Sequence, residues 1–360
     1  MIKIVTIIGA RPQFIKAAVV SRAVALRSDE IQEVIVHTGQ HFDSNMSDIF
    51  FEELDIPKPD YHLGVGGGTH GQNTGRMLEK IEEVLLKEKP NYVLVYGDTD
   101  STLAGTLAAV KLHIPVAHVE AGLRSFNRKM PEEINRILTD HASEILFTPT
   151  LTAVNNLNNE GIDSNKIKQV GDVMYDAAIY YGKKVEQNDS LLKELKIESK
   201  KYALVTLHRA ENVDDKERLS SIMQGLNHYK EQIILPLHPR TKKMMQNFNI
   251  GIPNTVKIID PIGYLDMILL EKHASVIATD SGGVQKEAYF HKVPCITLRD
   301  QTEWIELVSQ GANILTGANS DLLKQAFESV KNIEDSIFET PLYGNGDSGN
   351  QIVQALITFN

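Results

Sequence analysis

The fold is decided by the stretch Val276-Ile277-Ala278-Thr279-Asp280-Ser281-Gly282-Gly283-Val284-Gln285-Lys286-Glu287. A short apolar run leads directly into the first turn of a helix, which is the strand-turn-helix unit of an α/β protein. The unpaired N–H groups of that turn and the helix dipole attract an anion, and Gly282 and Gly283 let the backbone approach it closely. Glu287, about one turn further on, would accept hydrogen bonds from ribose hydroxyls, so the stretch predicts a site for a nucleoside diphosphate. The alternative is an ordinary Asp/Ser helix cap followed by a tight turn.

Length and composition indicate a globular protein of two domains. The 360 residues exceed what one ordinary core supports, and a hydrophobic content of 42% is ample for two. The formal net charge is −10 and no run of Lys or Arg stands out, which argues against nucleic acid or an anionic membrane as the main partner. The one cysteine, Cys295, lies in an apolar stretch and is expected to be buried, since a single thiol forms neither an internal disulfide nor a multi-cysteine metal site.

The first residues show no targeting segment. The run Met1-Ile2-Lys3-Ile4-Val5 is typical of a strand, and it reaches Gly9-Ala10-Arg11-Pro12 too soon for a signal peptide. No apolar run in the sequence approaches membrane-spanning length. We therefore expect a cytoplasmic protein that has no membrane partner.

Short β-branched runs alternate with helix-length amphipathic segments along the whole chain. The runs cover residues 4–8, 34–37, 92–96, 116–119 and 145–147 in the first half, and 203–207, 233–237, 256–259, 276–279, 295–298 and 313–315 in the second. This alternation predicts an α/β protein with two doubly wound domains, each a parallel sheet covered by helices on both faces. The polar stretch from Lys183 to Lys201 marks the boundary, so we expect domains at residues 1–180 and 181–345 and a last helix within 346–360.

The segments that follow the apolar runs are unusually polar. In parallel sheets, ligands bind beyond the carboxyl ends of the strands, so these segments are candidates for a site. They are residues 9–12, 38–41, 97–100 and 120–124 in the first domain, and 208–211, 238–240, 280–283 and 299–300 in the second. Each set would gather at one edge of its own sheet, and two such edges facing each other would form a cleft.

The predicted edge of the first domain is rich in carboxylates, namely Asp98, Asp100, Glu120, Glu132 and Glu133. Several carboxylates in one cleft can include a base and an acid near neutral pH, because burial and mutual repulsion separate their pKa values. Alternatively, Asp98 caps the helix that follows it, and Glu132 and Glu133 stabilise the first turn of another helix. Glu120 ends an apolar strand, where capping explains it less well, so it is the stronger functional candidate.

Cations and one histidine lie at strand ends and helix starts. Arg11 and Lys16 stand at the beginning of the first helix, where a cation opposes the helix dipole unless an anion binds there. Lys16 could equally be a solvated surface residue. His208 and Arg209 follow an apolar strand and are placed for a ligand. We expect no metal, because no closely spaced His, Asp, Glu or Cys set is present, and the glycines of a dinucleotide-binding fingerprint are missing.

Several segments together give the chain a family resemblance. They are Gly9-Ala10-Arg11-Pro12 with Lys16, Thr38-Gly39-Gln40-His41, Gly97-Asp98-Thr99, His118 to Arg124, Pro131 to Arg136, His208-Arg209, Asp280 to Ala288, and Tyr343-Gly344-Asn345-Gly346. In order and spacing they closely resemble the non-hydrolysing UDP-N-acetylglucosamine 2-epimerases over nearly the whole chain. The resemblance implies a fold of the glycosyltransferase-B type, with two Rossmann-like domains, UDP held mainly by the second, the sugar between them, and a C-terminal helix that crosses back to the first.

The resemblance also implies a reaction. The family inverts C2 of a sugar attached to UDP: a base removes the C2 proton as UDP leaves C1, a 2-acetamidoglycal stays bound, and UDP adds back after protonation from the opposite face. Matched to the family, the catalytic residues of this chain are Asp98, Glu120, Glu132 and His208, and the cations Arg11 and Lys16 with His208 would steady the departing diphosphate. The matched substrate-binding positions are Arg11, Lys16, Gln40, His41, Arg136, Arg209, Ser281, Gly282, Gly283 and Glu287. No cofactor is needed, and we expect a homodimer.

Two departures from the family pattern concern the sugar. Thr302-Glu303-Trp304-Ile305-Glu306 stands where many members have Thr-Glu-Arg-Pro-Glu, so the only tryptophan replaces a cation, and the loop 124–131 looks shorter than usual. Both features resemble the branch that acts on UDP-2,3-diacetamido-2,3-dideoxy-glucuronate, for which Arg128 or Lys129 would suit the sugar carboxylate. We expect UDP-N-acetylglucosamine as the substrate, with that acid as the alternative.

Two other classes of protein are alternatives on the same fold. A glycosyltransferase would need an acceptor groove and would consume the UDP-sugar. A catalytically silent UDP-sugar sensor would keep Ser281 and Glu287 but would not need the carboxylates around Asp98 and Glu120. Because those carboxylates are present, the sequence favours the epimerase.

Overall fold

The computed structural model describes residues 1–40, 54–186 and 189–359, with the exception of the Arg11 side chain. The chain forms two compact units. Unit 1 consists of Met1–Ala177 together with Leu342–Asn360, and unit 2 consists of Ala178–Pro341. Each unit has its own parallel sheet, so each is described by itself.

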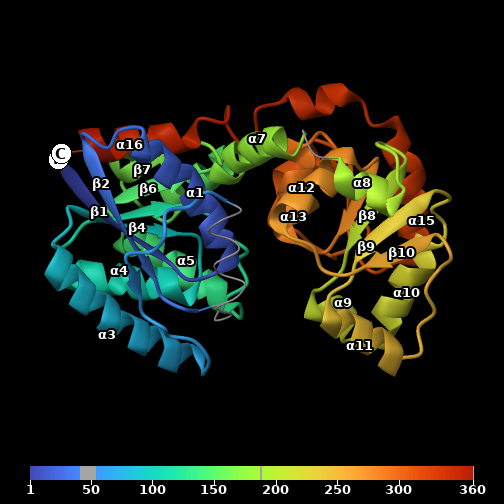
Figure 1. The fold of residues 1–360 in the computed structure, drawn as a ribbon, viewed down its shortest axis with the longest axis horizontal. Helices are drawn as coiled ribbons and strands as arrows, with labels where there is room; N and C mark the ends of the chain where they lie inside the picture. Colours follow the sequence, from blue (N-terminus) through green and yellow to red (C-terminus); the bar gives the residue numbers. More distant parts are fainter. Residues whose placement is uncertain (41–53, 187–188, 360) are drawn as a thin grey trace. The chain divides into compact units, whose positions relative to one another are not determined.

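Unit 1 contains a seven-stranded sheet in the order β3-β2-β1-β4-β5-β6-β7, in which every neighbouring pair is parallel (Figure 1). Its strands are β1 Ile2–Ile8, β2 Ile31–His37, β3 Tyr61–His62, β4 Tyr92–Tyr96, β5 Val116–Val119, β6 Ile145–Thr148 and β7 Ile167–Gln169. Its helices are α1 Arg11–Ala25, α3 His70–Glu88, α4 Asp100–Lys111, α5 Pro131–Ala142, α6 Leu151–Asn159, the 3-10 turn Ser164–Lys166 and α16 Ser348–Thr358. The boundary with unit 2 falls within α7 Val173–Val185.

The strands of unit 1 are apolar on both sides because helices cover both faces of the sheet. Val5 and Ile7 of β1 share one core with Met77 and Ile81 of α3, whose spacing of four residues puts both side chains on one face of that helix. Side chains alternate along a strand, so the other β1 residues point to the opposite face, where α1 packs. Figure 1 shows α1 and α16 on one side of the sheet and α3 and α4 on the other.

Unit 2 contains a six-stranded parallel sheet in the order β10-β9-β8-β11-β12-β13. Its strands are β8 Tyr202–Thr206, β9 Gln232–Pro236, β10 Val256–Ile259, β11 Val276–Thr279, β12 Cys295–Thr297 and β13 Asn313–Leu315. Its helices are α8 Ser190–Leu195, α9 Ala210–Val213, α10 Lys216–Leu226, α11 Pro239–Asn247, α12 Tyr264–His273, α13 Gly282–Phe290, α14 Ile305–Ser309 and α15 Ser320–Ser329, with 3-10 turns at Val330–Asn332 and Asp335–Glu339.

The core of unit 2 follows the same principle as that of unit 1. Val205 and Ala278, from neighbouring strands, share a buried cluster with Ile222 of α10 and Phe327 of α15. Cys295 is fully buried at the start of β12, as the sequence predicts. Burial raises the pKa of its thiol to about 12, so the thiolate is not populated near neutral pH.

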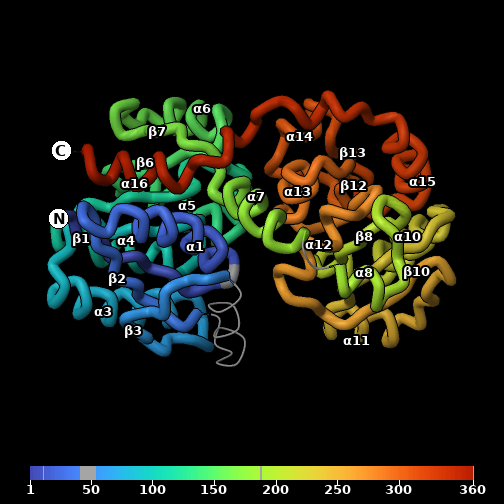
Figure 2. Tube along the Cα trace, turned by 45° about the horizontal axis from the view of Figure 1, so that its top comes forward, coloured from blue at the N-terminus to red at the C-terminus, as the bar shows by residue number. Residues whose placement is uncertain are grey.

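The last helix, α16, belongs to unit 1, although the chain reaches it from unit 2 (Figure 2). Gly349 lies so close to α1 that a Cβ at this position would come within 2.8 Å of Val19 Cγ1. The Gly349 N–H donates a 2.9 Å hydrogen bond to Asp176 Oδ2, and the Asp172 N–H donates one of 2.9 Å to the Tyr343 carbonyl. The C-terminal segment therefore crosses back to the first unit, as the family resemblance implies.

The predicted fold class, two parallel α/β domains, is confirmed. Every apolar run identified as a strand is one, although some ends differ by up to three residues. The sequence analysis does not predict β3 and β7, because strands of two and three residues are too short to show alternation. Among the helices of the described residues, none has the length and apolar character needed to cross a membrane.

Candidate functional site

Both sheets reverse their strand order at one point. The reversal lies between β1 and β4 in unit 1 and between β8 and β11 in unit 2. In doubly wound folds, ligands bind beyond the carboxyl ends of the strands on either side of such a reversal. The four strands are followed by residues 9–12, 97–100, 208–211 and 280–283, which are segments that the sequence analysis identifies as candidates.

Glu120 and Lys16 form an ion pair at the strand ends of unit 1. Lys16 on α1 is only 8% exposed, and Glu120 follows β5 with a φ of 72°, which is unusual for a residue other than glycine. Hydrogen bonds of 3.1 and 3.0 Å from the N–H groups of Glu120 and Ala121 to the Phe147 carbonyl hold this conformation. Gly97 borders the pair, because a Cβ there would lie 3.2 Å from Lys16 Nζ. A strained backbone that directs a carboxylate to a buried cation is typical of functional sites.

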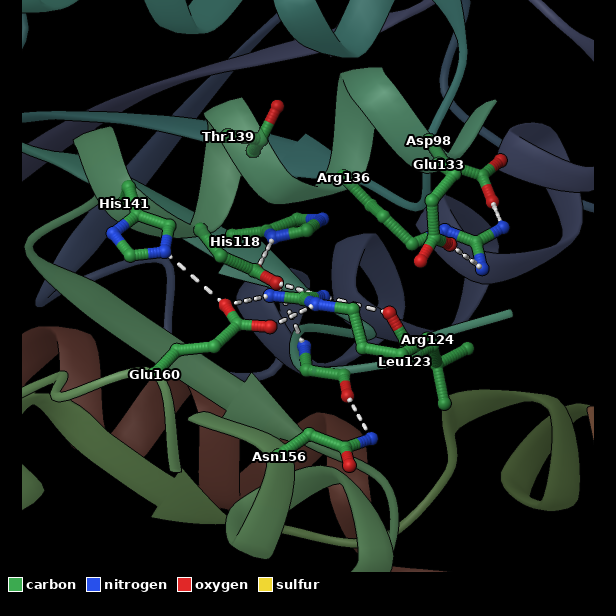
Figure 3. Close-up of polar contacts among 12 residues, drawn as sticks. Asp98, His118, Leu123, Arg124, Glu133, Arg136, Thr139, His141, Asn156 and Glu160 are labelled. Atoms are coloured by element: carbon green, nitrogen blue, oxygen red, sulfur yellow. Dashed lines mark hydrogen bonds and ion pairs between the residues drawn. The ribbon is translucent and has the colours of Figure 1, made fainter. Parts of the chain in front are cut away.

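Asp98 lies after β4 and is paired with Arg136 of α5, as Figure 3 shows. Its backbone carbonyl accepts a 3.0 Å hydrogen bond from Asn135 Nδ2. The capping alternative for Asp98 is wrong: the N-cap of α4 is Thr99, whose side chain accepts a hydrogen bond from the Thr102 N–H. The Asp98 side chain, 32% exposed, is therefore held by a cation at the edge of the sheet and is not used by its own helix.

Glu132 and Glu133 lie in the first turn of α5, directly after Pro131, as expected, but their environments differ. Glu133 is 1% exposed and accepts hydrogen bonds of 2.9 Å from the N–H groups of Ser125 and Phe126. Its role is to shape the loop before α5. Glu132 is exposed, which leaves it as the candidate for chemistry.

His70, the first residue of α3, joins these carboxylates, although the sequence analysis does not identify it. Its Nδ1 lies 2.9 Å from Asp100 Oδ2, and Asp100 is 6% exposed. The hydrogen bond to Asp100, the charge of Asp100 and, more weakly, the charge of Glu132 raise the pKa of His70. His70, Asp100 and Glu132 therefore form one group of interacting ionisable side chains. No local pattern marks His70, because its partner is 30 residues away in the sequence.

Gln40 is the last described residue after β2. Its Oε1 accepts hydrogen bonds from the N–H and Oγ of Ser101, at 3.1 and 2.7 Å, which ties it to the first turn of α4. Two other predicted positions, His41 and the side chain of Arg11, lie outside the described residues. Of the predicted substrate-binding side chains after β1 and β2, the structure thus places Lys16 and Gln40.

In unit 2, Asp280 braces the segment that follows β8. It is fully buried and accepts hydrogen bonds from the N–H groups of His208 and Arg209, at 3.1 and 2.9 Å, and from Asn212 Nδ2 at 3.3 Å. This brings the ends of β8 and β11 together. The imidazole of His208 remains 49% exposed, with Nε2 4.0 Å from Asp280 Oδ1.

Ser281, the N-cap residue of α13, makes no side-chain capping hydrogen bond, so its hydroxyl does not cap the first turn of this helix. The two glycines differ. A Cβ on Gly282 would meet Glu303 Oε1 at 2.3 Å, whereas a Cβ on Gly283 would meet only Ser281 Oγ, at 3.8 Å. The carboxylate of Glu303 therefore fills the space beside Gly282, whereas the space beside Gly283 is open.

Glu287 on α13 is 8% exposed and adjoins two other buried ionisable groups. Burial, together with the charge of Glu287, raises the pKa of Glu271 well above its ordinary value, and the same two causes raise the pKa of Tyr264. Burial thus disfavours the charged form of Glu271, and the neighbouring charge of Glu287 acts in the same direction. A carboxylate in such surroundings forms strong hydrogen bonds with hydroxyl donors.

Trp304 is buried against α13 with an exposure of 5%. Lys286 Nζ lies 4.3 Å from the centroid of its ring, which is a cation–π contact. Arg299 is close by in the sequence and pairs with Glu303 at 2.7 Å. The tryptophan that stands where the family pattern has arginine therefore does not leave this part of unit 2 without a cation.

Comparisons with known proteins find one family that matches this chain. A family model described as UDP-N-acetylglucosamine 2-epimerase matches residues 24–357. The chain is 55% identical to UDP-2,3-diacetamido-2,3-dideoxy-D-glucuronate 2-epimerase of Pseudomonas aeruginosa, over 98% of this chain and 99% of that protein. It is 51% identical to UDP-N-acetylglucosamine 2-epimerase of Methanocaldococcus jannaschii, over 98% of both. The crystal structure of the Methanocaldococcus jannaschii UDP-GlcNAc 2-epimerase in complex with UDP-GlcNAc and UDP matches with a TM-score of 0.88 at 51% identity, covering 99% of both chains.

Proposed function

Because this chain belongs to the UDP-N-acetylglucosamine 2-epimerase family, we propose that it interconverts UDP-N-acetylglucosamine and UDP-N-acetylmannosamine. The Methanocaldococcus jannaschii relative, whose crystal structure contains UDP-GlcNAc and UDP, supports this substrate. The observation that carries the proposal is the ion pair of Glu120 and Lys16 at the strand ends of unit 1. It sets a carboxylate beside a cation, and the reaction needs both a group that moves a proton and positive charge for a departing diphosphate.

The chemistry explains why both are needed. The C2 proton of the sugar is not acidic, so the reaction proceeds by elimination. A carboxylate takes the C2 proton, the electrons of that bond form the C1–C2 double bond, and the C1–O bond breaks with its electrons going to UDP. UDP then adds back to C1 of the 2-acetamidoglycal as an acid delivers a proton to the opposite face of C2. No electron is gained or lost overall, so no redox cofactor takes part.

We assign the proton transfers to Asp98, Glu120 and Glu132 of unit 1. Glu120 has Lys16 at its side, Asp98 is held by Arg136, and Glu132 lies close enough to His70 to influence its pKa. Each carboxylate thus has a different cationic or titratable neighbour. Such differences in environment are how one site keeps a base and an acid at the same pH.

We assign the nucleotide to unit 2. The N–H groups of the first turn of α13, with Ser281 and the open space at Gly283, suit the diphosphate. Glu287 is placed one turn further along the same helix and would accept hydrogen bonds from the ribose hydroxyls. His208 and Arg209, which Asp280 fixes beside this turn, would add positive charge for the departing UDP.

The alternative substrate is UDP-2,3-diacetamido-2,3-dideoxy-glucuronate, which the Pseudomonas aeruginosa relative favours. A site built for this acid holds a cation for the C6 carboxylate. A neutral hydroxymethyl group would leave that cation without its partner. Arg128 and Lys129, both exposed in the loop before α5, are the candidates in unit 1.

The experiment is to incubate the purified protein with UDP-N-acetylglucosamine in deuterated water and to follow the C1 and C2 signals by proton NMR. We expect UDP-N-acetylmannosamine to form with deuterium at C2, because the intermediate has lost that proton to a side chain that exchanges with solvent. An epimer that keeps its original proton would contradict the elimination route. A protein that binds UDP and turns over only the diacetamido acid would decide for the alternative.

We also propose that the protein is a homodimer. On α5, Ile134 and Leu138 are 39% and 47% exposed and lie one turn apart on the same face. An apolar pair of this kind supports contact with a second copy of the chain. Sedimentation of the protein and of an Ile134→Lys, Leu138→Glu variant should show a dimer and a monomer, respectively.

A further inference from the structure

A buried network of charged side chains adjoins Glu120 and has no part in the proton transfers assigned above. It consists of His118 on β5, Arg124 in the loop that follows, Asp140 on α5 and Glu160 after α6 (Figure 3). The side chains of His118 and Asp140 are 0% exposed, and that of Arg124 is 1% exposed. Groups buried so deeply must satisfy one another, so their protonation states follow from their contacts.

Each ring nitrogen of His118 faces an oxygen that can accept a hydrogen bond. Its Nδ1 lies 2.7 Å from Asp140 Oδ1, and its Nε2 lies 2.7 Å from the carbonyl oxygen of Gly97. A carbonyl oxygen only accepts hydrogen bonds, so Nε2 carries a proton. Whether the ring is charged therefore depends on Nδ1 and on the state of Asp140.

Asp140 is ionised and does not donate a proton to Nδ1. Its Oδ2 accepts hydrogen bonds from the Gly122 N–H at 3.1 Å and from the Arg124 guanidinium at 2.7 Å. Burial raises the pKa of Asp140, whereas the charge and the hydrogen bond of Arg124 lower it. Nδ1 must then be a donor as well, so both ring nitrogens carry protons.

The balance of charge gives the same answer. Arg124 bonds both oxygens of Glu160, at 2.6 and 2.7 Å. With a charged His118, the network holds two cations and two carboxylates. Glu160 is 26% exposed and also lies 3.1 Å from His141 Nε2, so its charge is partly solvated. With a neutral His118, the fully buried Asp140 would share Arg124 with Glu160 and have no second cation, which is costly.

We propose that His118 is a buried imidazolium that positions the two carboxylate-bearing loops of the active site, a role that rests on the function proposed above. His118 lies two residues before Glu120, and its Nε2–H holds the carbonyl of Gly97, the residue directly before Asp98. Gly97 adopts a φ of 62° and borders Lys16, so a shift of this turn would move Asp98 and the Glu120 ion pair together. A neutral ring bonded to ionised Asp140 through Nδ1–H would present a lone pair to the Gly97 carbonyl and could not hold it.

The protonation state is tested on the wild-type protein by NMR of its histidine ring nitrogens after selective labelling with nitrogen-15. The signals of His118 are those that disappear in a His118→Asn variant. We expect both nitrogens to show a directly bonded proton near neutral pH. One unprotonated nitrogen would overturn the proposal. This measurement does not depend on turnover, so it is distinct from a failure of the proposed function, which would show as wild-type protein that does not epimerise a UDP-sugar.

The positioning role is tested by a matched pair of variants. In His118→Asn the amide nitrogen lies near the place of Nδ1 and keeps the donor to Asp140, whereas in His118→Gln it lies near the place of Nε2 and keeps the donor to Gly97. We expect His118→Gln to melt at a lower temperature but to keep most of its kcat, and His118→Asn to lose about tenfold to a hundredfold in kcat, because small misplacements of reacting groups have effects of this size.

Affinity for UDP, which we assign to unit 2, should stay unchanged in both variants. The kcat values are expressed per folded molecule, counted from the thermal melt followed by circular dichroism, so that a loss of stability lowers the number of active sites and not kcat. The reverse order of kcat in the two variants, or wild-type kcat in both, would overturn the positioning role.

Discussion

At the scale of single residues, Glu120 shows how a functional carboxylate can conflict with its own backbone. Its φ of 72° lies in the left-handed region, where a residue with a Cβ is strained by on the order of 1 to 3 kcal/mol. Glycine would relieve the strain but would remove the partner of Lys16. The sequence marks Glu120 by its place after an apolar strand, but only the structure shows its φ.

Glu287 is the residue whose change should most directly report the nucleotide. Glu287→Gln keeps the shape of the side chain and removes its charge, so we expect UDP to bind about tenfold to a hundredfold more weakly, as the loss of charge-assisted hydrogen bonds predicts. Calorimetric titration with UDP measures this. Glu328→Gln, at an exposed position of the same unit, is the control and should bind UDP as the wild type does. If both variants bind UDP with the same affinity, Glu287 does not bind the ribose.

His70 gives the protein a pH-dependent contribution to stability. The hydrogen bond to Asp100 raises the folded-state pKa of His70 above the ordinary value of 6.5. This contribution is therefore fully present below the ordinary pKa and is lost as the pH rises through the folded-state value. The melting temperature of the wild type should exceed that of His70→Gln at about pH 5.5, and the difference should vanish at about pH 9. A difference that is the same at both pH values would contradict the assignment.

At the scale of elements, the loop between β5 and α5 depends on a glycine. Gly122 has a φ of 81°, and a Cβ there would lie 2.5 Å from the Ala153 carbonyl oxygen of α6. Its N–H also donates to Asp140. The loop that carries Glu120 is thus fixed by backbone conformation, by close packing and by the buried charge network together.

The substitution Gly122→Ala should lower the free energy of unfolding of unit 1 by more than about 2 kcal/mol. The cost of backbone strain and the cost of steric overlap with the Ala153 carbonyl both contribute to this loss. Gly75→Ala is the matched control in the same unit. Gly75 lies in the interior of α3, and a Cβ there would have nothing within 4 Å, so alanine should stabilise by up to about 1 kcal/mol. Urea denaturation of the three proteins measures both effects, and shifts of the same sign in the two variants would contradict this account of Gly122.

At the scale of the whole molecule, the two units have separate assignments, proton transfer for unit 1 and UDP for unit 2. Each unit has its own sheet and its own core. A change to a carboxylate of unit 1 should therefore alter turnover without altering nucleotide affinity. This separation distinguishes the epimerase from a UDP-sugar sensor, which would need nucleotide affinity but no turnover.

The substitutions Asp98→Asn and Glu120→Gln should each lower kcat by roughly a hundredfold or more, as expected for a lost acid or base group, with wild-type affinity for UDP. The exchange assay in deuterated water and calorimetry measure the two properties. Glu144→Gln, an exposed carboxylate of the same unit that pairs with Lys166, is the control and should turn over at the wild-type rate. If both active-site variants keep the wild-type kcat, these carboxylates take no part in proton transfer and have only a structural role.

The sequence by itself determined the order of elements, the parallel sheets and the polar segments at their carboxyl ends. These are local properties: the alternation of strand and helix is written in the spacing of apolar residues, and a helix that starts at Gly282 after an apolar run is visible from a dozen neighbouring positions. The family resemblance likewise rests on short segments such as 118–124 and 280–288. From these, the fold class and most of the candidate residues follow.

Only the tertiary structure decided which of these residues contact one another and what each contact does. Arg136, which the sequence analysis matches to a substrate-binding position, pairs with Asp98 of the same unit. His70 forms a hydrogen bond with Asp100. Asp280 holds the segment after β8 through hydrogen bonds to its N–H groups, and Glu303 packs beside Gly282. Such contacts join residues up to 72 positions apart in different elements, so no local pattern records them, and the protonation of a buried group such as His118 follows from its neighbours in space.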